Sequence, residues 1–339
     1  MRIGDRIYEL VLYNRSIKQI ATYFLKCPLL IGNPLYRFSY ASLVTKKMRK
    51  FESVPFRVII ENTNACNADC TFCPHKMMSR KTGIMDMDLT RRIIDECKDL
   101  GIDYVAIYGF GEPLLDPHFF ERVEYAKWKG ISRVITNTNA MYLNNEKTRK
   151  ILESGIDEVY ISFDAATEET YKKIRPGLSF RTVEQNVLNL VKEKKQRSSD
   201  KPEIILSFVE SSVNKQEAKR FIQKWTNMAD NISISIIHNW TGDIESNNKD
   251  NIGSRRDACR LLWTDMVISW NSEVPLCCND YENRIILGNI KHQSIKEIWG
   301  GKELRKIRGS HIQGNFKEVS LCANCGYNYH HKSPWWVFK

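Results

Sequence analysis

Residues 56–73, FRVIIENTNACNADCTFC, combine an apolar run with a closely spaced group of cysteines. The first part is rich in β-branched residues, which is typical of a buried strand. Cys66, Cys70 and Cys73 follow in the spacing C-x3-C-x2-C. Three thiolates on one loop can hold three corners of a [4Fe–4S] cluster and leave the fourth iron open, as a catalytic centre requires. We therefore expect a catalytic metal centre at the end of a strand.

A zinc site is the alternative for these thiols. Zinc usually takes four protein ligands in two pairs. His75 is too close to Cys73 in sequence to complete a relaxed site. The spacing therefore favours iron–sulfur over zinc.

The chain after residue 55 alternates between short β-rich runs and helical patterns. Such alternation indicates parallel β-α units, so we expect an α/β fold that forms a partial (β/α)6 barrel. The expected strands are Phe56–Glu61, Tyr104–Tyr108, Arg133–Thr136, Glu158–Phe163, Glu203–Val209 and Ile232–His238. The expected helices cover about residues 88–100, 117–129, 144–154, 181–195 and 214–228.

Changes in composition divide the chain into three parts. Residues 1–52 form a basic N-terminal extension, residues 53–240 the barrel, and residues 241–339 a small cysteine-rich domain that begins with a polar stretch. In the last part we expect a hairpin from Trp263–Trp270 to Val274–Cys277. A helix at about 294–308 should follow, with Gly300 and Gly301 as a potential interruption.

A second group of cysteines lies in the C-terminal part. Four thiolates suffice to hold a complete [4Fe–4S] cluster, and a structural zinc site is the alternative. The predicted ligands are Cys259, Cys277, Cys322 and Cys325. We prefer Cys277 to Cys278 because neighbours on a strand point to opposite faces, so only one of them is expected to be a ligand.

The cysteine triplet after the first strand, with Phe72 before its last member, resembles the radical S-adenosylmethionine (SAM) superfamily. This resemblance covers about residues 55–240 and implies a cluster that binds SAM and cleaves it to a 5′-deoxyadenosyl radical. It implies further SAM-binding positions at the ends of successive strands, where ligands gather in parallel α/β folds. These are Gly109, Gly111 and Glu112 of the GFGEP turn, Asn137 of TNT, Ser162 of ISFDA and Arg175 of RPG. Phe110 stands where the family has a glycine.

The C-terminal cysteines resemble SPASM domains and their shortened twitch form, which has one auxiliary cluster. The resemblance extends to 2-deoxy-scyllo-inosamine dehydrogenase-like enzymes. It implies an oxidoreductase that abstracts a hydrogen atom and oxidises the substrate radical through the auxiliary [4Fe–4S] cluster. The implied partners are a carbohydrate, cyclitol or glycoconjugate substrate and an electron donor of the flavodoxin or ferredoxin type. The alternatives are a SPASM-type peptide maturase and, from another class, a zinc-binding protein associated with nucleic acid.

The acid or base that serves the substrate is not identified by any motif. Positional candidates are Arg175, Asp164, Glu210 and His238.

Charge is concentrated at the N-terminus. The chain carries a net charge of +11, and its first fifty residues hold ten basic side chains against Asp5 and Glu9. An apolar stripe from Ile7 to Leu25 predicts an amphipathic helix, which packs on the barrel, contacts an anionic membrane surface, or binds nucleic acid or another acidic partner. No nucleic-acid-binding module is recognisable. Ten cysteines without a secretory signal favour a cytoplasmic protein, with membrane association through residues 1–50 as an additional expectation.

Overall fold

The computed structural model describes residues 51–244 and 258–327. The predicted N-terminal amphipathic helix, most of the polar stretch after residue 241 and the C-terminal aromatic residues lie outside these ranges. None of the helices within them combines the length and apolar character needed to cross a bilayer.

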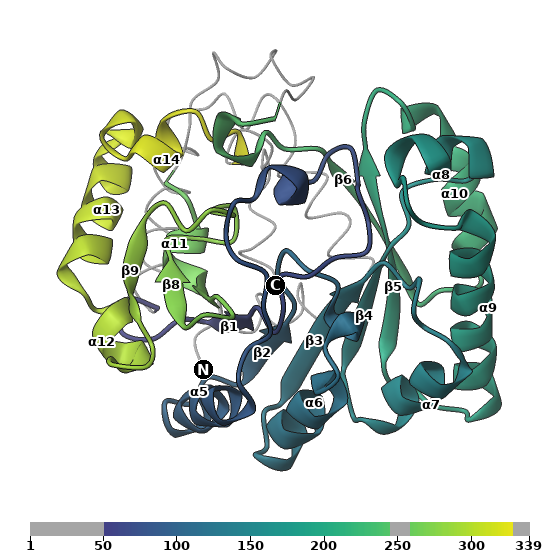
Figure 1. The fold of residues 1–339 in the computed structure, drawn as a ribbon, viewed down its shortest axis with the longest axis horizontal. Helices are drawn as coiled ribbons and strands as arrows, with labels where there is room; N and C mark the ends of the chain where they lie inside the picture. The colour runs from purple at the N-terminus through teal and green to yellow at the C-terminus, as the bar shows by residue number, and fades with distance from the viewer. Residues whose placement is uncertain (1–50, 245–257, 328–339) are drawn as a thin grey trace, which may run out of the picture.

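Seven parallel strands form one sheet in the order β6-β5-β4-β3-β2-β1-β7 (Figure 1). The α/β fold and all six strands expected from the sequence are confirmed. The bounds are β1 Arg57–Ile60, β2 Tyr104–Ile107, β3 Arg133–Thr138, β4 Glu158–Ser162, β5 Glu203–Glu210, β6 Asn231–Ile236 and β7 Asp265–Ile268. The sheet is open between β6 and β7, as expected of a partial barrel.

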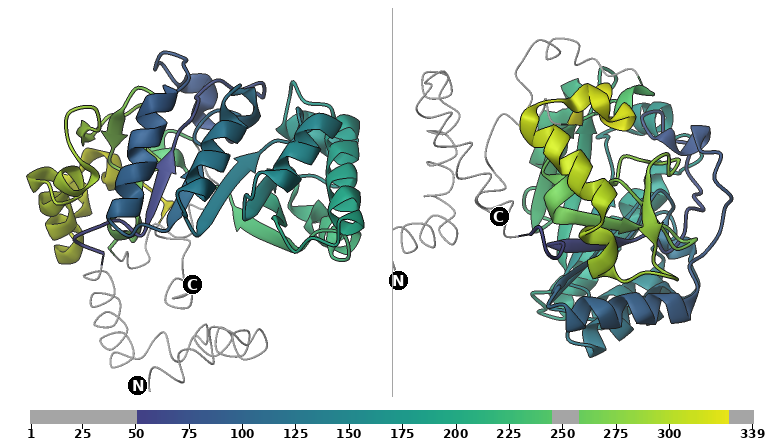
Figure 2. Two further views of the ribbon diagram at one scale, coloured as in Figure 1. Left: turned by 90° about the horizontal axis from the view of Figure 1, so that it is seen from below. Right: turned by 90° about the vertical axis from the view of Figure 1, so that its left-hand side faces the viewer.

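Helices cover one face of this sheet, as Figures 1 and 2 show. Their bounds are α5 Met87–Asp99, α6 Phe119–Trp128, α7 Asn145–Glu153, α8 Glu168–Ile174, α9 Phe180–Gln196 and α10 Ala218–Trp225. Polar side chains cap the helix starts: Asp86 accepts two backbone N–H bonds before α5, and Ser179 accepts one before α9. The five expected helices are present, and α8 is an addition.

The predicted hairpin in the C-terminal part is wrong. Strand β7 pairs in parallel with β1, with Val267 opposite Ile59, and so completes the large sheet. Strand β8, Glu273–Pro275, pairs instead with β9, Ile286–Asn289, in a separate antiparallel sheet. A tight turn at Asn271–Ser272 reverses the chain as expected, but the apolar residues of β7 are buried against β1 rather than along β8.

The described C-terminal part also contains helices, of which α12 lies beside α5 (Figure 1). They are α11 Leu261–Thr264, α12 Ile295–Trp299, α13 Lys302–Gln313 and α14 Ser320–Ala323. Gly300 and Gly301 separate α12 from α13, so the expected interruption is confirmed. The division of the chain at residues 240 and 241 stays a prediction; strand β7, which comes after it, joins the large sheet.

The two faces of the sheet have different neighbours. Val58, Val105 and Val134 are fully buried against the helices. On the opposite face, a row across β7, β1, β2 and β3 forms a small apolar cluster of Ile59, Ala106, Ile135 and Val267. Among the helices that the structure describes, none packs along this second face, called the inner face below, which ends at the loops that carry the predicted site.

Candidate active site

The loop with Cys66, Cys70 and Cys73 begins after the C-terminal end of β1. It is held mainly by its backbone. Thr71 donates its N–H to the carbonyl of Ile174 at 2.9 Å, and Asp69 donates to that of Pro176 at 3.1 Å. These bonds attach the loop to the segment after α8. The sequence-predicted Arg175 is therefore brought directly to the cysteines.

Arg175 connects β4 to the cysteine loop. Its Nε donates to Asp164 Oδ2 at 2.8 Å, its Nη2 bonds the same oxygen, and its Nη1 lies 3.3 Å from Cys70 Sγ. Asp164 is fully buried, directly after β4, and has a left-handed φ of 64°. Burial alone would lower the pKa of Arg175, but the charges of Asp164 and Cys70 raise it above its ordinary value. A permanent positive charge therefore lies beside the predicted iron ligands.

The three thiols lie in a water-poor environment. Burial raises the pKa of Cys66 to about 11 and that of Cys73 to about 12, and it also raises the pKa of Cys70. The thiols are thus protonated near neutral pH until a metal replaces their protons. The guanidinium of Arg175 opposes the shift at all three cysteines, which favours the thiolate form that a cluster needs.

The GFGEP turn packs against the start of the cysteine loop. A Cβ atom at Gly111 would lie 2.5 Å from the carbonyl oxygens of Thr63 and Ala65, so this contact requires glycine. A Cβ at Gly109 would lie 2.4 Å from the Glu61 side chain. The backbone N–H of Glu112 donates to Ala65 at 2.8 Å, which closes the contact.

Glu112 is engaged within the protein. Its carboxylate accepts the Thr138 hydroxyl at 2.6 Å, the Asn139 N–H at 2.7 Å and the Leu114 N–H at 3.2 Å. The side chain is buried, and burial raises its pKa. Three donors from the chain thus bind the carboxylate that the sequence analysis placed among the SAM-binding positions. In the structure it braces β3 against the GFGEP turn.

The remaining predicted SAM-binding residues form a row at the strand ends. Ser162, at the end of β4, donates its hydroxyl to Asn137 Oδ1 on β3 at 3.0 Å. Phe72 lies within the cysteine loop, with its ring 5.8 Å from the Arg175 guanidinium. The structure therefore brings the predicted set around one edge of the sheet. Among the candidates for an acid or base, Asp164 and Arg175 are ion-paired, and the His238 ring packs against the Trp240 ring in a tilted arrangement, with centroids 4.1 Å apart.

The C-terminal cysteines form a second group. The thiols of Cys259, Cys277, Cys322 and Cys325 come from α14 and three loops, and all are buried or half-buried. Burial raises the pKa of Cys277, and the neighbouring thiols of Cys278, Cys259 and Cys325 raise it further. Burial raises the pKa of Cys278 to about 12, with Asp265 as the next contribution. Cys278 packs against both the apolar cluster of the inner face and the main core, and it also raises the pKa of Cys259, so the choice of Cys277 over Cys278 stays a prediction.

Sequence reasoning missed two side chains near the first cysteine loop. Tyr171 on α8 is fully buried, its hydroxyl has no hydrogen-bond partner, and it interacts electrostatically with Arg175 and Cys70. Trp240 donates its indole N–H to the carbonyl of Phe72 at 2.7 Å. Tyr171 is hard to predict because the short helix α8 has no clear hydrophobic periodicity. Trp240 is hard to predict because its bond to Phe72 joins residues 168 positions apart.

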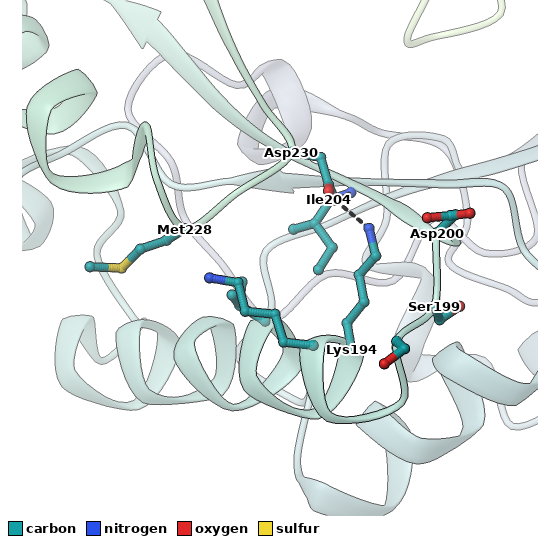
Figure 3. A pocket seen from close by; sticks show the side chains of 9 residues that line it. Lys194, Ser199, Asp200, Ile204, Met228 and Asp230 are labelled. Carbon is teal, nitrogen blue, oxygen red and sulfur yellow. Dashed lines mark hydrogen bonds and ion pairs between the residues drawn. The ribbon is translucent and has the colours of Figure 1, made fainter.

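One cavity of about 320 Å³ lies elsewhere (Figure 3). It is formed by the end of α9 and the following loop, where Lys194 reaches Asp230 at 2.6 Å. Because it adjoins Ile204 near the start of β5, it is at the opposite end of the strands from the cysteines. It has no part in the candidate site.

The fold and these cysteine groups define an iron–sulfur enzyme of the radical SAM class. Residues 60–206 match the radical SAM superfamily, and residues 259–326 match the iron–sulfur cluster-binding SPASM domain. The chain therefore belongs to the radical SAM superfamily, and its cofactors are SAM and [4Fe–4S] clusters.

Individual relatives are similar over most of the chain. The tungsten-containing aldehyde ferredoxin oxidoreductase cofactor-modifying protein of Pyrococcus furiosus is 28% identical, over 79% of this chain and 88% of that protein. The S-adenosyl-L-methionine-dependent 2-deoxy-scyllo-inosamine dehydrogenase of Niallia circulans is 24% identical, over 78% of this chain and 90% of that one. The structure of Streptococcus suis SuiB bound to the precursor peptide SuiA has a TM-score of 0.63 at 15% identity, over 88% and 76% of the two chains, which shows the shared fold.

The residues around the first cysteine group fit such a cofactor. Across the described residues, no three His, Cys, Asp or Glu side chains are arranged to hold one metal ion, so the fit is judged from the surroundings of the thiols. Arg175 offers a positive charge to the Cys70 sulfur, and the Tyr171 hydroxyl leaves an unused donor near it. Because residue 111 is glycine, no side chain separates its backbone from the start of the cysteine loop. A cluster with thiolate ligands gains from these features, because hydrogen bonds and charge near its sulfurs stabilise it.

Proposed function

We propose that this enzyme oxidises a secondary alcohol of a small polyhydroxylated molecule, such as a carbohydrate or a cyclitol. The observation that carries the proposal is the pairing of a three-cysteine loop with a second, four-cysteine group at the same end of the sheet. The similarity to 2-deoxy-scyllo-inosamine dehydrogenase supports the substrate class.

Bound cofactors supply the radical chemistry: the first cluster and SAM provide a 5′-deoxyadenosyl radical, and the auxiliary cluster accepts an electron. Cys66, Cys70 and Cys73 would hold the first cluster. The second set, in the single-cluster twitch arrangement, is Cys259, Cys277, Cys322 and Cys325. The chain itself positions these groups: residues 174–176 fix the first loop through Asp69 and Thr71.

SAM would lie along the edge formed by the GFGEP turn and the ends of β3 and β4. Asn137 and Ser162 offer an amide and a hydroxyl there. The remaining donors of Arg175 and the backbone oxygens near Gly111 are the groups suited to the carboxylate and the ammonium of an amino acid. Glu112 contributes by holding the turn, because its carboxylate is bonded to β3.

The inner face provides small polar groups for a hydroxylated substrate. Ser162, Ser207 and Ser233 are in register on β4, β5 and β6. Their neighbours Ile161 and Leu206 are buried against the helices, so the serines face the inner side. All three are half-buried, and Tyr108 and Tyr160 flank the apolar cluster deeper along the same face. Hydroxyl groups can donate and accept hydrogen bonds with sugar or cyclitol hydroxyls.

The test is a deuterium-transfer experiment. Anaerobically reconstituted, reduced enzyme is incubated with SAM and a panel of aminocyclitols and sugars deuterated at the carbinol carbons. Oxidation of a carbinol to a ketone moves its carbon-bound deuterium into 5′-deoxyadenosine, while the hydroxyl proton goes to solvent. Mass spectrometry should find deuterated 5′-deoxyadenosine and one equivalent of ketone. Absence of deuterium transfer from every panel member would contradict the substrate class.

A peptide maturase is the competing function, and the fold shared with SuiB is the reason to test it in the same assay. The same assay distinguishes the two when synthetic peptides replace the sugars: a maturase would form a cross-linked or otherwise modified peptide. We expect 5′-deoxyadenosine to rise with the polyol panel and not with the peptides. An electron donor of the flavodoxin or ferredoxin type would replace the chemical reductant in the cell.

Contact with an anionic membrane remains a proposal based on the basic residues 1–50, which lie outside the described ranges. Basic residues near an anionic bilayer contribute about 1 kcal/mol each. Flotation with anionic but not neutral vesicles, lost on deletion of residues 1–26, would support it. The same contact would suit a glycoconjugate substrate; failure to float at low salt would count against both ideas.

A further inference from the structure

Residues 239–243, Asn-Trp-Thr-Gly-Asp, contact both cysteine loops, and we propose that they form a clasp that fixes the two loops relative to each other. The clasp follows β6 and includes the short helix Trp240–Gly242. Its value for catalysis rests on the proposed function, which uses both cysteine groups. Its contacts, described next, are independent of that function.

The clasp holds the first cysteine loop through Trp240. The indole N–H donates to the carbonyl of Phe72 at 2.7 Å, and Phe72 lies between Cys70 and Cys73. The ring is packed from two sides, 5.6 Å from Phe110 and 4.1 Å from His238. Because the ring is confined, the direction of the hydrogen bond is fixed as well.

The clasp holds the second cysteine loop through Asn239. Its Nδ2 donates to the carbonyl of Asn324 at 2.6 Å, and its Oδ1 accepts the N–H of Gly326 at 2.6 Å. Asn324 lies between Cys322 and Cys325. A Cβ atom at Gly242 would lie 2.9 Å from the Cβ of Asn324, so the backbones also pack closely.

A third contact reaches the segment after Cys277. Asp243 accepts a hydrogen bond from the Tyr281 hydroxyl at 3.0 Å and forms an ion pair with Arg284. The Tyr281 ring lies 6.2 Å from Phe110, the residue that also packs on Trp240. Phe110 occupies the position where the first glycine of the family turn was expected. Its side chain thereby gains a role that glycine could not fill, because it links the GFGEP turn to the clasp.

The backbone of the clasp is held in an unfavourable conformation. Trp240 has φ 43°, Thr241 has φ 67° and Gly242 has φ 109°. Two consecutive non-glycine residues in the left-handed region are unfavourable and persist only where the surroundings determine them. The side-chain hydrogen bonds of Asn239 and Asp243, at the two ends of the bend, hold the backbone in this conformation. We infer that the bend is kept because it points Trp240 to one loop and Asn239 to the other.

Hydrogen exchange of the cluster-loaded protein, measured by mass spectrometry, tests the clasp. Trp240→Phe removes the bond to Phe72 but keeps an aromatic ring, and Asn239→Ala removes the bonds to the second loop. If the clasp links the two cysteine loops rigidly, breaking its contact with one loop should also loosen the other loop, since coupling between two sites is reciprocal. Trp240→Phe should speed exchange in residues 322–326, and Asn239→Ala should speed exchange in residues 69–73. Local support alone would not produce these crossed effects.

Trp128→Phe and Asn227→Ala are matched controls, because both side chains are exposed and remote from the cysteines. They should leave exchange in both loops unchanged. Faster exchange confined to the loop that each clasp residue touches would overturn the proposal, as would loss of iron from one cysteine group only. The measurement needs no turnover. An enzyme that failed to oxidise polyols would therefore leave this result intact, and the two failures can be told apart.

Discussion

Arg175 Nη1 lies 3.3 Å from the sulfur of Cys70, and the same guanidinium is ion-paired with the buried carboxylate of Asp164. This hydrogen bond brings the positive charge of the guanidinium next to Cys70, a predicted iron ligand. The carboxylate fixes the orientation of the guanidinium, since Nε and Nη2 both bond Asp164 Oδ2. This arrangement gives Arg175 a role toward the cluster in addition to any contact with SAM.

Replacing Arg175 by Met is expected to lower the reduction potential of the first cluster by tens of millivolts. A positive charge and a hydrogen bond at a ligand sulfur favour the reduced, more negative cluster, and the substitution removes both. A redox titration followed by electron paramagnetic resonance measures the change in protein without substrate. Arg181→Met, at an exposed position on α9, is the control. An unchanged potential with full iron content would contradict this role.

Gly111→Ala is expected to impair assembly of the first cluster. The added methyl group would meet two carbonyl oxygens of residues 63–65 at 2.5 Å, directly before Cys66. The loop must then shift, because neither carbonyl belongs to a flexible side chain. Iron analysis after anaerobic reconstitution should show a loss toward half of the wild-type content.

The control for Gly111→Ala is Gly309→Ala on α13, where a Cβ meets nothing within 4 Å. Alanine there should retain all iron and stabilise the helix by up to about 1 kcal/mol. Equal iron content in the two variants would show that the close approach at Gly111 is not needed.

The sequence predicted the large sheet well and the C-terminal part less well, for a physical reason. Strands β1 to β5 are apolar runs between helical patterns, so local composition locates them. Strand β7 carries an equally apolar run, but its pairing with β1 joins residues 208 positions apart, as in the Arg57–Asp265 bond. Local pattern suggested the nearer partner, β8. Helix α8 has only seven residues and was missed for lack of periodicity.

For the candidate site, motif spacing located the cysteines and the strand-end residues. The partners of these residues could not be predicted in the same way. Nothing in the sequence indicates that Glu112 binds Thr138 and Asn139, or that Trp240 reaches Phe72, because these contacts depend on how strands and loops meet in space. The roles of individual side chains thus needed the structure.

Serine substitutions should separate Cys277 from Cys278. Cys277 interacts electrostatically with Cys259 and Cys325, and Cys278 interacts with Cys259 while also packing against the apolar cluster of the inner face. With both clusters the protein should hold about eight irons, and loss of a ligand should remove about four. Cys277→Ser is expected to lose the auxiliary cluster and Cys278→Ser to keep it. The reverse pattern would assign the ligand to Cys278, and stoichiometric zinc in the wild type would refute the auxiliary cluster.

Arg122→Met is expected to destabilise the protein by about 3–5 kcal/mol, because it leaves the Asp116 carboxylate buried without its countercharge. Both side chains are fully buried, with Arg122 Nε 2.7 Å from Asp116 Oδ2. Asp116 also accepts from Asn62, four residues before Cys66, at 2.9 Å. The pair therefore supports the strand end that leads to the first cysteine loop. Denaturant unfolding of the cluster-loaded protein measures the loss.

Two further variants decide whether the buried charge is the cause of that loss. Arg91→Met breaks exposed ion pairs with Asp88 and Glu121 and should cost no more than about 1 kcal/mol. The double variant Arg122→Met with Asp116→Asn removes the stranded charge, so it should be more stable than Arg122→Met alone. A double variant that is less stable than the single one would instead show that Asp116 matters through its hydrogen bonds to Asn62 and to the N–H of His118.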